Sequence, residues 1–160
     1  MLNQVFRVSL ILLMTRTAFA SPNLGEIAKN ADGSIKTMSQ ADAFEYCKNQ
    51  GGHLPTAREL AEYSRSLGAT GVIEIADRKV NDHDSYMIGA WNPDGAIDKF
   101  YFNKSGYQQP SGDLGNNWFW SSSGSFANLY GDYVLNGNNG SIDFAYRDNG
   151  WHAVRCILAQ

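Results

Sequence analysis

Apolar residues recur at helical spacing in two stretches near the front of the chain, and each stretch carries a helix-start signal. Ser39 followed by Asp42 is similar to a capping box, and Thr56 followed by Glu59 matches one fully. The first helix is expected to end at the glycine pair that starts at Gly51, because glycine readily adopts the left-handed conformation of a helix end. The apolar stripes consist of Ala43, Phe44 and Cys47 in the first helix and Leu60, Tyr63 and Leu67 in the second.

From residue 85 onward the pattern changes to short aromatic and β-branched runs separated by Asn, Gly, Asp and Pro, which predicts strands joined by turns. The strongest turn signal is NGNNG at 136–140, which predicts a hairpin. Helices followed by mostly antiparallel strands define an α+β fold with the helices packed on the sheet. The predicted strands are SYMIGAW at 85–91, KFYFN at 99–103, NWFWSSS at 117–123, DYVLN at 132–136, SIDFAYR at 141–147 and HAVRCIL at 152–158.

The first twenty residues have the layout of an export signal. A positive charge at Arg7 precedes an apolar run from Val8 to Met14, and Ala18-Phe19-Ala20 forms a small-x-small cleavage site. The run is too short for a membrane anchor, and the alternative is a buried N-terminal helix. We therefore expect a secreted or periplasmic protein with no integral membrane segment after cleavage. The expected divisions are a signal peptide at 1–20, a lead-in at 21–35 and one folded domain at 36–160.

Composition and charge narrow the class of protein further. The net charge is −3 and no basic stripe is present, so the phosphate-neutralising contribution to nucleic-acid binding is missing and no nucleic-acid partner is expected. The chain has 16 Gly, 4 Trp, 8 Tyr and 8 Phe but only 18% charged residues. This balance fits a loop-rich, exported β-containing domain better than a helix bundle.

The chain contains two cysteines, Cys47 and Cys156. In an oxidising compartment an even count suggests a disulfide, and two cysteines allow one connectivity. Closing so long a loop in the unfolded chain would stabilise the fold by roughly 4–5 kcal/mol in the chain-entropy model. The alternative is two buried free thiols.

Two motifs together resemble a known family. The front pattern A-x3-C-x3-GG-x-L-P-T-x2-E spans residues 43–59, and the tail combines NWFWSSS with AVRCI at 153–157. Both are similar to bacterial C-type lectin-like domains, of the type found in bacterial surface paralogues and at the tips of collagen-like and invasin or intimin adhesins. The resemblance covers roughly residues 36–158. It implies a two-helix, two-sheet body, a disulfide from the first helix to the last strand, and a long loop region projecting from one end.

The candidate binding surface lies in the aromatic and amide-rich stretches 107–120 and 126–139. Aromatic rings supply apolar contact and neighbouring amides supply orientation, which suits sugars and flat protein surfaces. The alternative is that Trp118, Trp120 and Trp151 alternate into the core, which is the expectation for Trp120, and that Tyr130 and the turn are simply solvated. The candidate binding residues are Tyr107, Gln109, Asp113, Asn116, Asn117, Trp118, Tyr130, Asp132, Asn138 and Asn139.

Calcium and other cofactors are not expected. The calcium-dependent sugar site of the family needs E-P-N or Q-P-D in the long loop and W-N-D on the next strand. This chain has Gln109-Pro110-Ser111 and Asn116-Asn117-Trp118 instead. A second candidate, Asp82 with Asp84, offers hard oxygens but lacks the EF-hand spacing, so a solvated loop is favoured.

The sequence does not favour an enzyme. Its three histidines lie beside no nucleophile motif, and the serine run 121–123 lacks the Gly-x-Ser-x-Gly elbow. The sulfatase-modifying enzymes share the broad fold but depend on a reactive cysteine pair, which the disulfide frame would occupy here. We therefore expect a non-enzymatic protein that binds a glycan or a surface protein. The alternative is a structural or accessory protein of a bacterial envelope complex that binds another exported protein, and a hydrolase is the least favoured.

Overall fold

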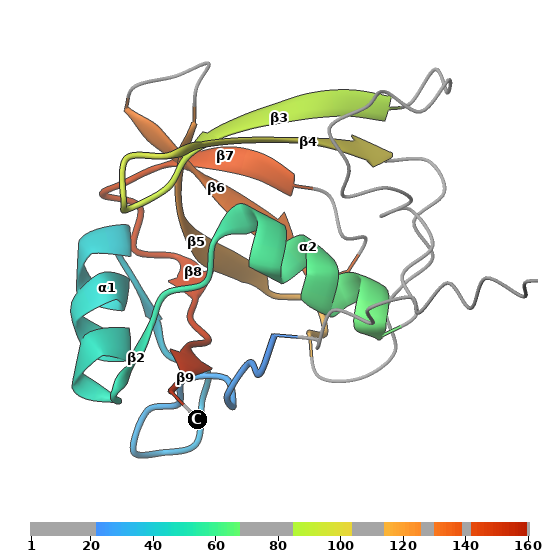
Figure 1. Ribbon diagram of the computed structural model, residues 1–160. Coiled ribbons are helices and arrows are strands. Elements are labelled where there is room, and N and C mark those ends of the chain that lie inside the picture. The colour runs from blue at the N-terminus through green and yellow to red at the C-terminus, as the bar shows by residue number, and fades with distance from the viewer. Residues whose placement is uncertain (1–21, 68–84, 104–113, 126–129, 139–141, 160) are drawn as a thin grey trace, which may run out of the picture.

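The computed structural model describes residues 22–67, 85–103, 114–125, 130–138 and 142–159 (Figure 1). Within these ranges the chain is an α+β protein, as predicted, with two helices and nine strands. The expected signal peptide at 1–20 lies outside the described residues. Neither described helix is long and apolar enough to cross a membrane.

The elements follow the predicted order, with the helices ahead of the long strands. The helices are α1 (Gln40–Asn49) and α2 (Ala57–Ser66). The strands are β1 (Thr37–Met38), β2 (Gly52–His53), β3 (Ser85–Trp91), β4 (Ile97–Asn103), β5 (Trp118–Ser125), β6 (Gly131–Asn136), β7 (Ile142–Tyr146), β8 (His152–Ala153) and β9 (Ile157–Leu158).

Both helices begin at the predicted caps. The Ser39 hydroxyl accepts the Asp42 backbone N–H at the start of α1. At the start of α2 the Glu59 N–H donates to Thr56 Oγ1 at 3.1 Å, and the Thr56 N–H donates to Glu59 Oε2 at 2.8 Å. This reciprocal pair satisfies backbone donors that the first turn leaves without helical partners. Gly51 follows α1 with φ of +75°, so the predicted left-handed helix end is confirmed.

The strands form a seven-stranded sheet and a small two-stranded one. In the larger sheet the order is β1-β8-β5-β3-β4, and β6 and β7 continue from the other side of β5. The pairs are antiparallel except β5 with β8, which run parallel. The two-stranded sheet joins β2 to β9. The last predicted strand is therefore split into β8 and β9, and residues 154–156 between them leave the ladder.

The central strands β5 and β6 pack against a different helix on each face. Side chains alternate along a strand, so successive residues enter opposite cores. Trp120 and Val134 belong to the cluster under α1, whereas Phe119 and Leu135 belong to the cluster under α2. Figure 1 shows this arrangement, with α1 at the left and α2 in front of β5 and β6. Two small cores thus share one sheet.

The stretch expected to be a lead-in, 21–35, contributes to both cores. Leu24 and Ala28 are buried. The Ala28 N–H donates to the Val154 carbonyl at 2.9 Å, and Leu24 forms an isolated antiparallel bridge with Ile157. The backbone carbonyls of Val154 and Cys156 thus accept hydrogen bonds from the N-terminal segment and not from a neighbouring strand of the sheet. This explains the break between β8 and β9.

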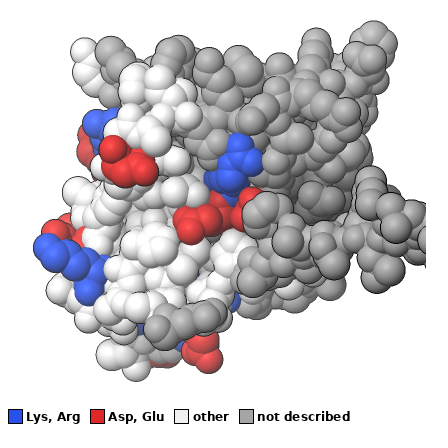
Figure 2. Space-filling view, in the orientation of Figure 1, with Lys and Arg blue, Asp and Glu red and all other residues white. Residues whose placement is uncertain are grey.

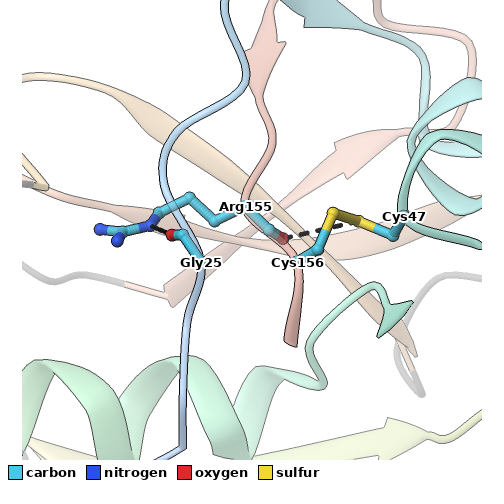
Figure 3. The surroundings of a disulfide bond; sticks show 4 residues. All are labelled: Gly25, Cys47, Arg155 and Cys156. Carbon is cyan, nitrogen blue, oxygen red and sulfur yellow. Dashed lines mark hydrogen bonds between the residues drawn. A yellow bond between two sulfur atoms is a disulfide. The ribbon is translucent and has the colours of Figure 1, made fainter. Parts of the chain in front are cut away.

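The predicted disulfide is present and joins α1 to the residue before β9 (Figure 3). The Cα atoms of Cys47 and Cys156 are 5.3 Å apart, and the Cys156 carbonyl accepts the Gly25 N–H at 2.8 Å. Arg155 extends the other way, where its Nε donates to the Gly25 carbonyl at 2.7 Å and its guanidinium lies 5.2 Å from the Tyr63 ring centroid. The V-R-C motif therefore connects the helices, the last strand and the N-terminal segment.

The tryptophan predictions have mixed outcomes. Trp120 is fully buried and its Nε1 donates to the Met38 carbonyl at 2.8 Å, so its predicted core position is confirmed. Trp118 is half-buried. The alternative that Trp151 also enters the core is wrong, because its side chain is 83% exposed. Trp151 lies in a turn before β8 begins, where strand alternation does not apply, and the next residue, His152, packs edge-on against Trp120 at 4.6 Å.

The second glycine of the pair is required by close packing. A Cβ on Gly52 would lie 2.1 Å from the Ile157 carbonyl oxygen. Gly52→Ala must push β2 away from β9, and we expect a loss of about 2 kcal/mol in the free energy of unfolding, measured by urea titration. Gly51→Asn is the matched control, since open space surrounds Gly51 and Asn tolerates positive φ. Equal losses in the two variants would contradict the packing explanation.

Candidate functional site

The structure describes six of the ten candidate binding residues. Tyr107, Gln109, Asp113 and Asn139 lie outside the described residues, as do Asp82 and Asp84 of the second calcium candidate. The remaining six fall into two groups at opposite ends of β6. Since a strand rises about 3.3 Å per residue, the two ends of β6 are roughly 17 Å apart. The described candidates therefore do not form one continuous site.

One group gathers where β5 begins and β6 ends. Trp118 pairs with Asn136 across the two strands, and the Gly137 N–H donates to the Asn117 carbonyl at 2.8 Å. The Asn117 amide donates in turn to the Leu114 carbonyl at 3.2 Å. These bonds hold two turns against each other. Asn116, Asn117, Trp118 and Asn138 therefore belong to an ordered turn pair whose polar groups are partly used within the fold.

The other group, Tyr130 and Asp132, lies at the opposite end of β6. Tyr130 is 78% exposed, as a binding loop requires. Asp132, in contrast, is buried, with 2% of its side chain exposed. Asp132 is the second residue of β6 and shares a face with Val134, so strand alternation turns it inward. Its Oδ2 accepts a bond from Arg147 Nε at 2.7 Å.

Asp132 and Arg147 are among the residues that line a groove between α1 and the sheet. The groove has a volume of about 290 Å³ and is open to solvent. Its walls come from α1, from the end of β3 and the turn after it, and from β5. The residues that define its chemistry are Gln40, Phe44, Trp91, Ser122, Asp132 and Arg147. We call this feature the Asp132 groove.

The charged residues that line the groove are Asp132 and Arg147, and they form an ion pair. Burial raises the pKa of the Asp132 carboxyl, and the hydrogen bond and charge of Arg147 act in the opposite direction. The Arg147 side chain is 57% exposed, whereas that of Asp132 is 2% exposed. A Cβ on Gly124 would lie 3.3 Å from Asp132 Oδ1, so glycine at this position leaves the carboxylate room.

The serine run in β5 has mainly structural roles. Ser121 Oγ donates to the Tyr133 carbonyl at 2.7 Å. Ser123 Oγ accepts the Ala57 N–H at 2.9 Å, which extends the capping of α2. Ser122 differs, because its Oγ is buried, lines the groove side of the strand and has no hydrogen-bond partner among the described residues. The serine run therefore stabilises the fold through hydrogen bonds of Ser121 and Ser123, and the Ser122 hydroxyl has no partner among the described residues.

Sequence reasoning did not find most of the groove. Phe44 lies in α1, Trp91 ends β3 and Arg147 follows β7, so the three are far apart in the chain and no local spacing joins them. Topology brings them together, because β3 pairs with the end of β5 at Ala90–Ser125 and Trp91–Gly124. The one signal available earlier was Asp132 at the start of a predicted strand, since an acid that alternates inward needs a cationic partner.

His152 provides a pH-dependent feature beside the core. Both ring nitrogens are buried and have no hydrogen-bond partner within the described residues. Burial lowers the pKa of His152 below its usual value near 6.5, because the charged form loses hydration. The unfolded chain therefore takes up a proton more readily than the folded one. Stability that is present above pH 6.5 should fall as the pH drops toward the folded-state pKa, by up to about 1.4 kcal/mol per pH unit.

The measurement is urea unfolding of the wild type and His152→Phe between pH 7.5 and pH 5. Phenylalanine keeps the ring but cannot be protonated, so the variant should lose part of the pH dependence. Parallel pH profiles of the two proteins would contradict this role for His152.

No family model, no curated protein and no solved structure matches this chain. In the part of the chain that the structure describes, no three His, Cys, Asp or Glu side chains are grouped so as to hold a metal ion. Figure 2 shows the face that is turned to the viewer in Figure 1. On its described part, acidic and basic side chains are interspersed, without a broad patch of one sign. Among the described residues, the Asp132 groove is the concave feature that brings aromatic, polar and charged side chains together.

Proposed function

We propose that this chain is an exported, non-enzymatic binding domain of the bacterial C-type lectin-like type, and that it recognises a glycan or a surface protein. The observation that carries this proposal is the Asp132 groove, where the exposed ring of Trp91 stands beside a buried, ion-paired carboxylate. Small-molecule sites combine apolar walls with a few fixed polar groups in this way.

The Cys47–Cys156 disulfide supports the proposed resemblance to the C-type lectin-like family. The disulfide from α1 to the residue before β9 matches what the resemblance implies, as does the order of two helices before the long strands. A disulfide is also compatible with an extracellular or periplasmic location. The fold and the disulfide do not specify a ligand, which depends on the side chains of the site.

A protein partner is the second candidate, and one feature favours it. Phe144 and Tyr146 project from β7 with 47% and 59% of their side chains exposed, and their rings meet edge to face with centroids 6.4 Å apart. Exposed aromatic pairs are enriched where proteins contact one another. Under this candidate the chain is an accessory component of an envelope complex that binds another exported protein.

A glycan array tests the proposal. The oxidised protein is applied in buffer and again with a chelator, because we expect binding without calcium. Glycan binding that survives the chelator supports the proposal. Binding lost with the chelator contradicts the calcium-free part, and no glycan binding at all favours the protein partner.

A further inference from the structure

We propose that the Asp132 groove binds the C-terminal carboxylate of a peptide whose last side chain is apolar, with Arg147 on the carboxylate and Trp91 beside the side chain. This inference rests on the proposed binding function, and it names the part of a protein partner that the groove would take. A free aromatic acid carries the same two groups, so it forms one arm of the test.

Arg147 is the residue that can hold an anion. Its side chain is 57% exposed and that of Asp132 is 2% exposed, so a ligand meets the guanidinium and not the carboxylate. Asp132 bonds Arg147 at Nε alone, and neither Nη nitrogen has a hydrogen-bond partner among the described residues. The two Nη groups of an arginine can donate two parallel bonds to one carboxylate, which makes this anion the best match.

The guanidinium is held in place before any ligand arrives. At the backbone, the Arg147 carbonyl accepts the Gln40 N–H at 3.1 Å, where α1 begins. At the side chain, Nε donates to the buried Asp132 carboxylate at 2.7 Å. A side chain fixed in this way loses less conformational freedom on binding than a free one, so more of the interaction appears as affinity.

An apolar wall stands next to the guanidinium. A Cβ on Gly124 would lie 3.6 Å from both Arg147 Nη2 and Trp91 Cβ, so these two side chains border the same small space. Trp91 is 40% exposed, and Phe44 and Pro93 add apolar surface to the groove. The last residue of a peptide carries its carboxylate and its side chain on one Cα atom. It therefore offers an anion and an apolar group at the close spacing that Arg147 and Trp91 require.

The size and openness of the groove favour a chain end over a free small molecule. Sites for free ligands are commonly 300–1,000 Å³ and enclose most of the ligand surface. This groove has a volume of about 290 Å³ and is open to solvent. It has room for about one terminal residue, and the preceding residues of the peptide can leave through the open side.

Ser122 provides a second donor for the carboxylate. Its side chain is 6% exposed and lines the groove, and its Oγ has no hydrogen-bond partner within the described ranges. Buried hydroxyls are almost always paired, so a ligand acceptor accounts for this one. Rotation about the Cα–Cβ bond directs the hydroxyl into the groove, where a carboxylate oxygen can accept it. A cationic or purely apolar ligand would leave both Ser122 and Arg147 unused.

The test is a titration of the oxidised protein with two N-acetylated hexapeptides of Gly and Ser that end in Phe or Leu. Each peptide is used as the free acid and as the C-terminal amide, and binding is followed by tryptophan fluorescence and by NMR of the indole groups. We expect at least one acid to bind about tenfold more tightly than its amide, because the amide lacks the charge and the second acceptor oxygen. The acid that ends in Ser should bind more weakly than either.

Protein variants assign the binding to the groove. Trp91→Ala should weaken binding of the acid about tenfold and keep its preference over the amide. Arg147→Lys keeps a charge beside Asp132 but loses the two-bond fork, so the preference should fall to about twofold. Trp151→Ala is the matched control, since this exposed tryptophan does not line the groove, and it should leave the Kd within about twofold. Circular dichroism checks that each variant folds.

Equal binding of acid and amide by the wild type, or no binding of either, overturns the inference without any variant. The proposed function still stands in that case if a glycan or an intact exported protein binds. Tight binding of 3-phenylpropionate, equal to that of the Phe peptide, overturns the peptide occupant. Displacement of the peptide by an equal concentration of inorganic phosphate overturns the carboxylate assignment, and unchanged binding in Trp91→Ala overturns the assignment to the groove.

Discussion

Removing the Cys47–Cys156 bridge in the double variant Cys47→Ala/Cys156→Ala is expected to lower the free energy of unfolding by about 4–5 kcal/mol. The two residues are 109 positions apart, so the bridge removes a large amount of conformational freedom from the unfolded chain. Both sulfurs lie in the core under α1, and alanine there also leaves a small void. A Tm decrease on the order of 15 °C should accompany the loss.

Urea unfolding of the wild type, with and without reductant, gives the measurement. The reduced wild type should approach the stability of the double variant, and the double variant should not respond to reductant. Equal stabilities of the oxidised and reduced wild type would contradict the prediction. They would also mean that the bridge does not constrain the unfolded chain in solution.

Trp120→Ala is expected to destabilise the protein by about 4 kcal/mol. Trp120 is fully buried, fills the space between α1 and the sheet, and donates its indole N–H to the Met38 carbonyl at 2.8 Å. Its ring also packs edge-on against His152, with centroids 4.6 Å apart. Alanine therefore loses apolar burial, a hydrogen bond and an aromatic contact together.

Two variants separate these contributions. Trp120→Phe keeps most of the apolar burial but leaves the Met38 carbonyl without its indole donor, and we expect a smaller loss of about 2 kcal/mol. Trp151→Ala removes a tryptophan that is 83% exposed and should change stability by less than about 0.5 kcal/mol. Similar losses for Trp151→Ala and Trp120→Ala in urea titrations would contradict the two burial assignments.

Local signals made the helices and most strands predictable. The Ser39 and Thr56 caps act within one helical turn, so the residues that form them are visible in the sequence and the structure places them as expected. Period-two alternation likewise identified Trp120 as a core residue of β5. Alternation failed at Trp151, because this residue lies in a turn where its backbone N–H donates to Asn149 Oδ1 and not to a neighbouring strand.

Non-local contacts decided what could not be predicted. The burial of Leu24 depends on a bridge to Ile157 at the other end of the chain, and no pattern near Leu24 announces it. The Asp132 groove has the same origin, since its walls come from α1, β3 and β5. Composition indicated aromatic and amide-rich stretches, but it did not indicate which residues meet in the fold. The ligand of the groove stays a proposal, because the fold places the groups without naming what they bind.

The bridge between α1 and the last strand also limits how far the folded domain can be stretched. Under a pull applied at residues 22 and 159, only the chain outside the Cys47–Cys156 loop carries tension, which is roughly 28 residues or about 95 Å when fully extended. Without the bridge the same pull would extend the whole segment to about 460 Å. Most residues of the Asp132 groove, from Trp91 to Arg147, lie inside the loop, whereas Gln40 and Phe44 lie in the segment before Cys47 that carries the tension. The oxidised protein would therefore keep the sheet side of the groove out of the line of force.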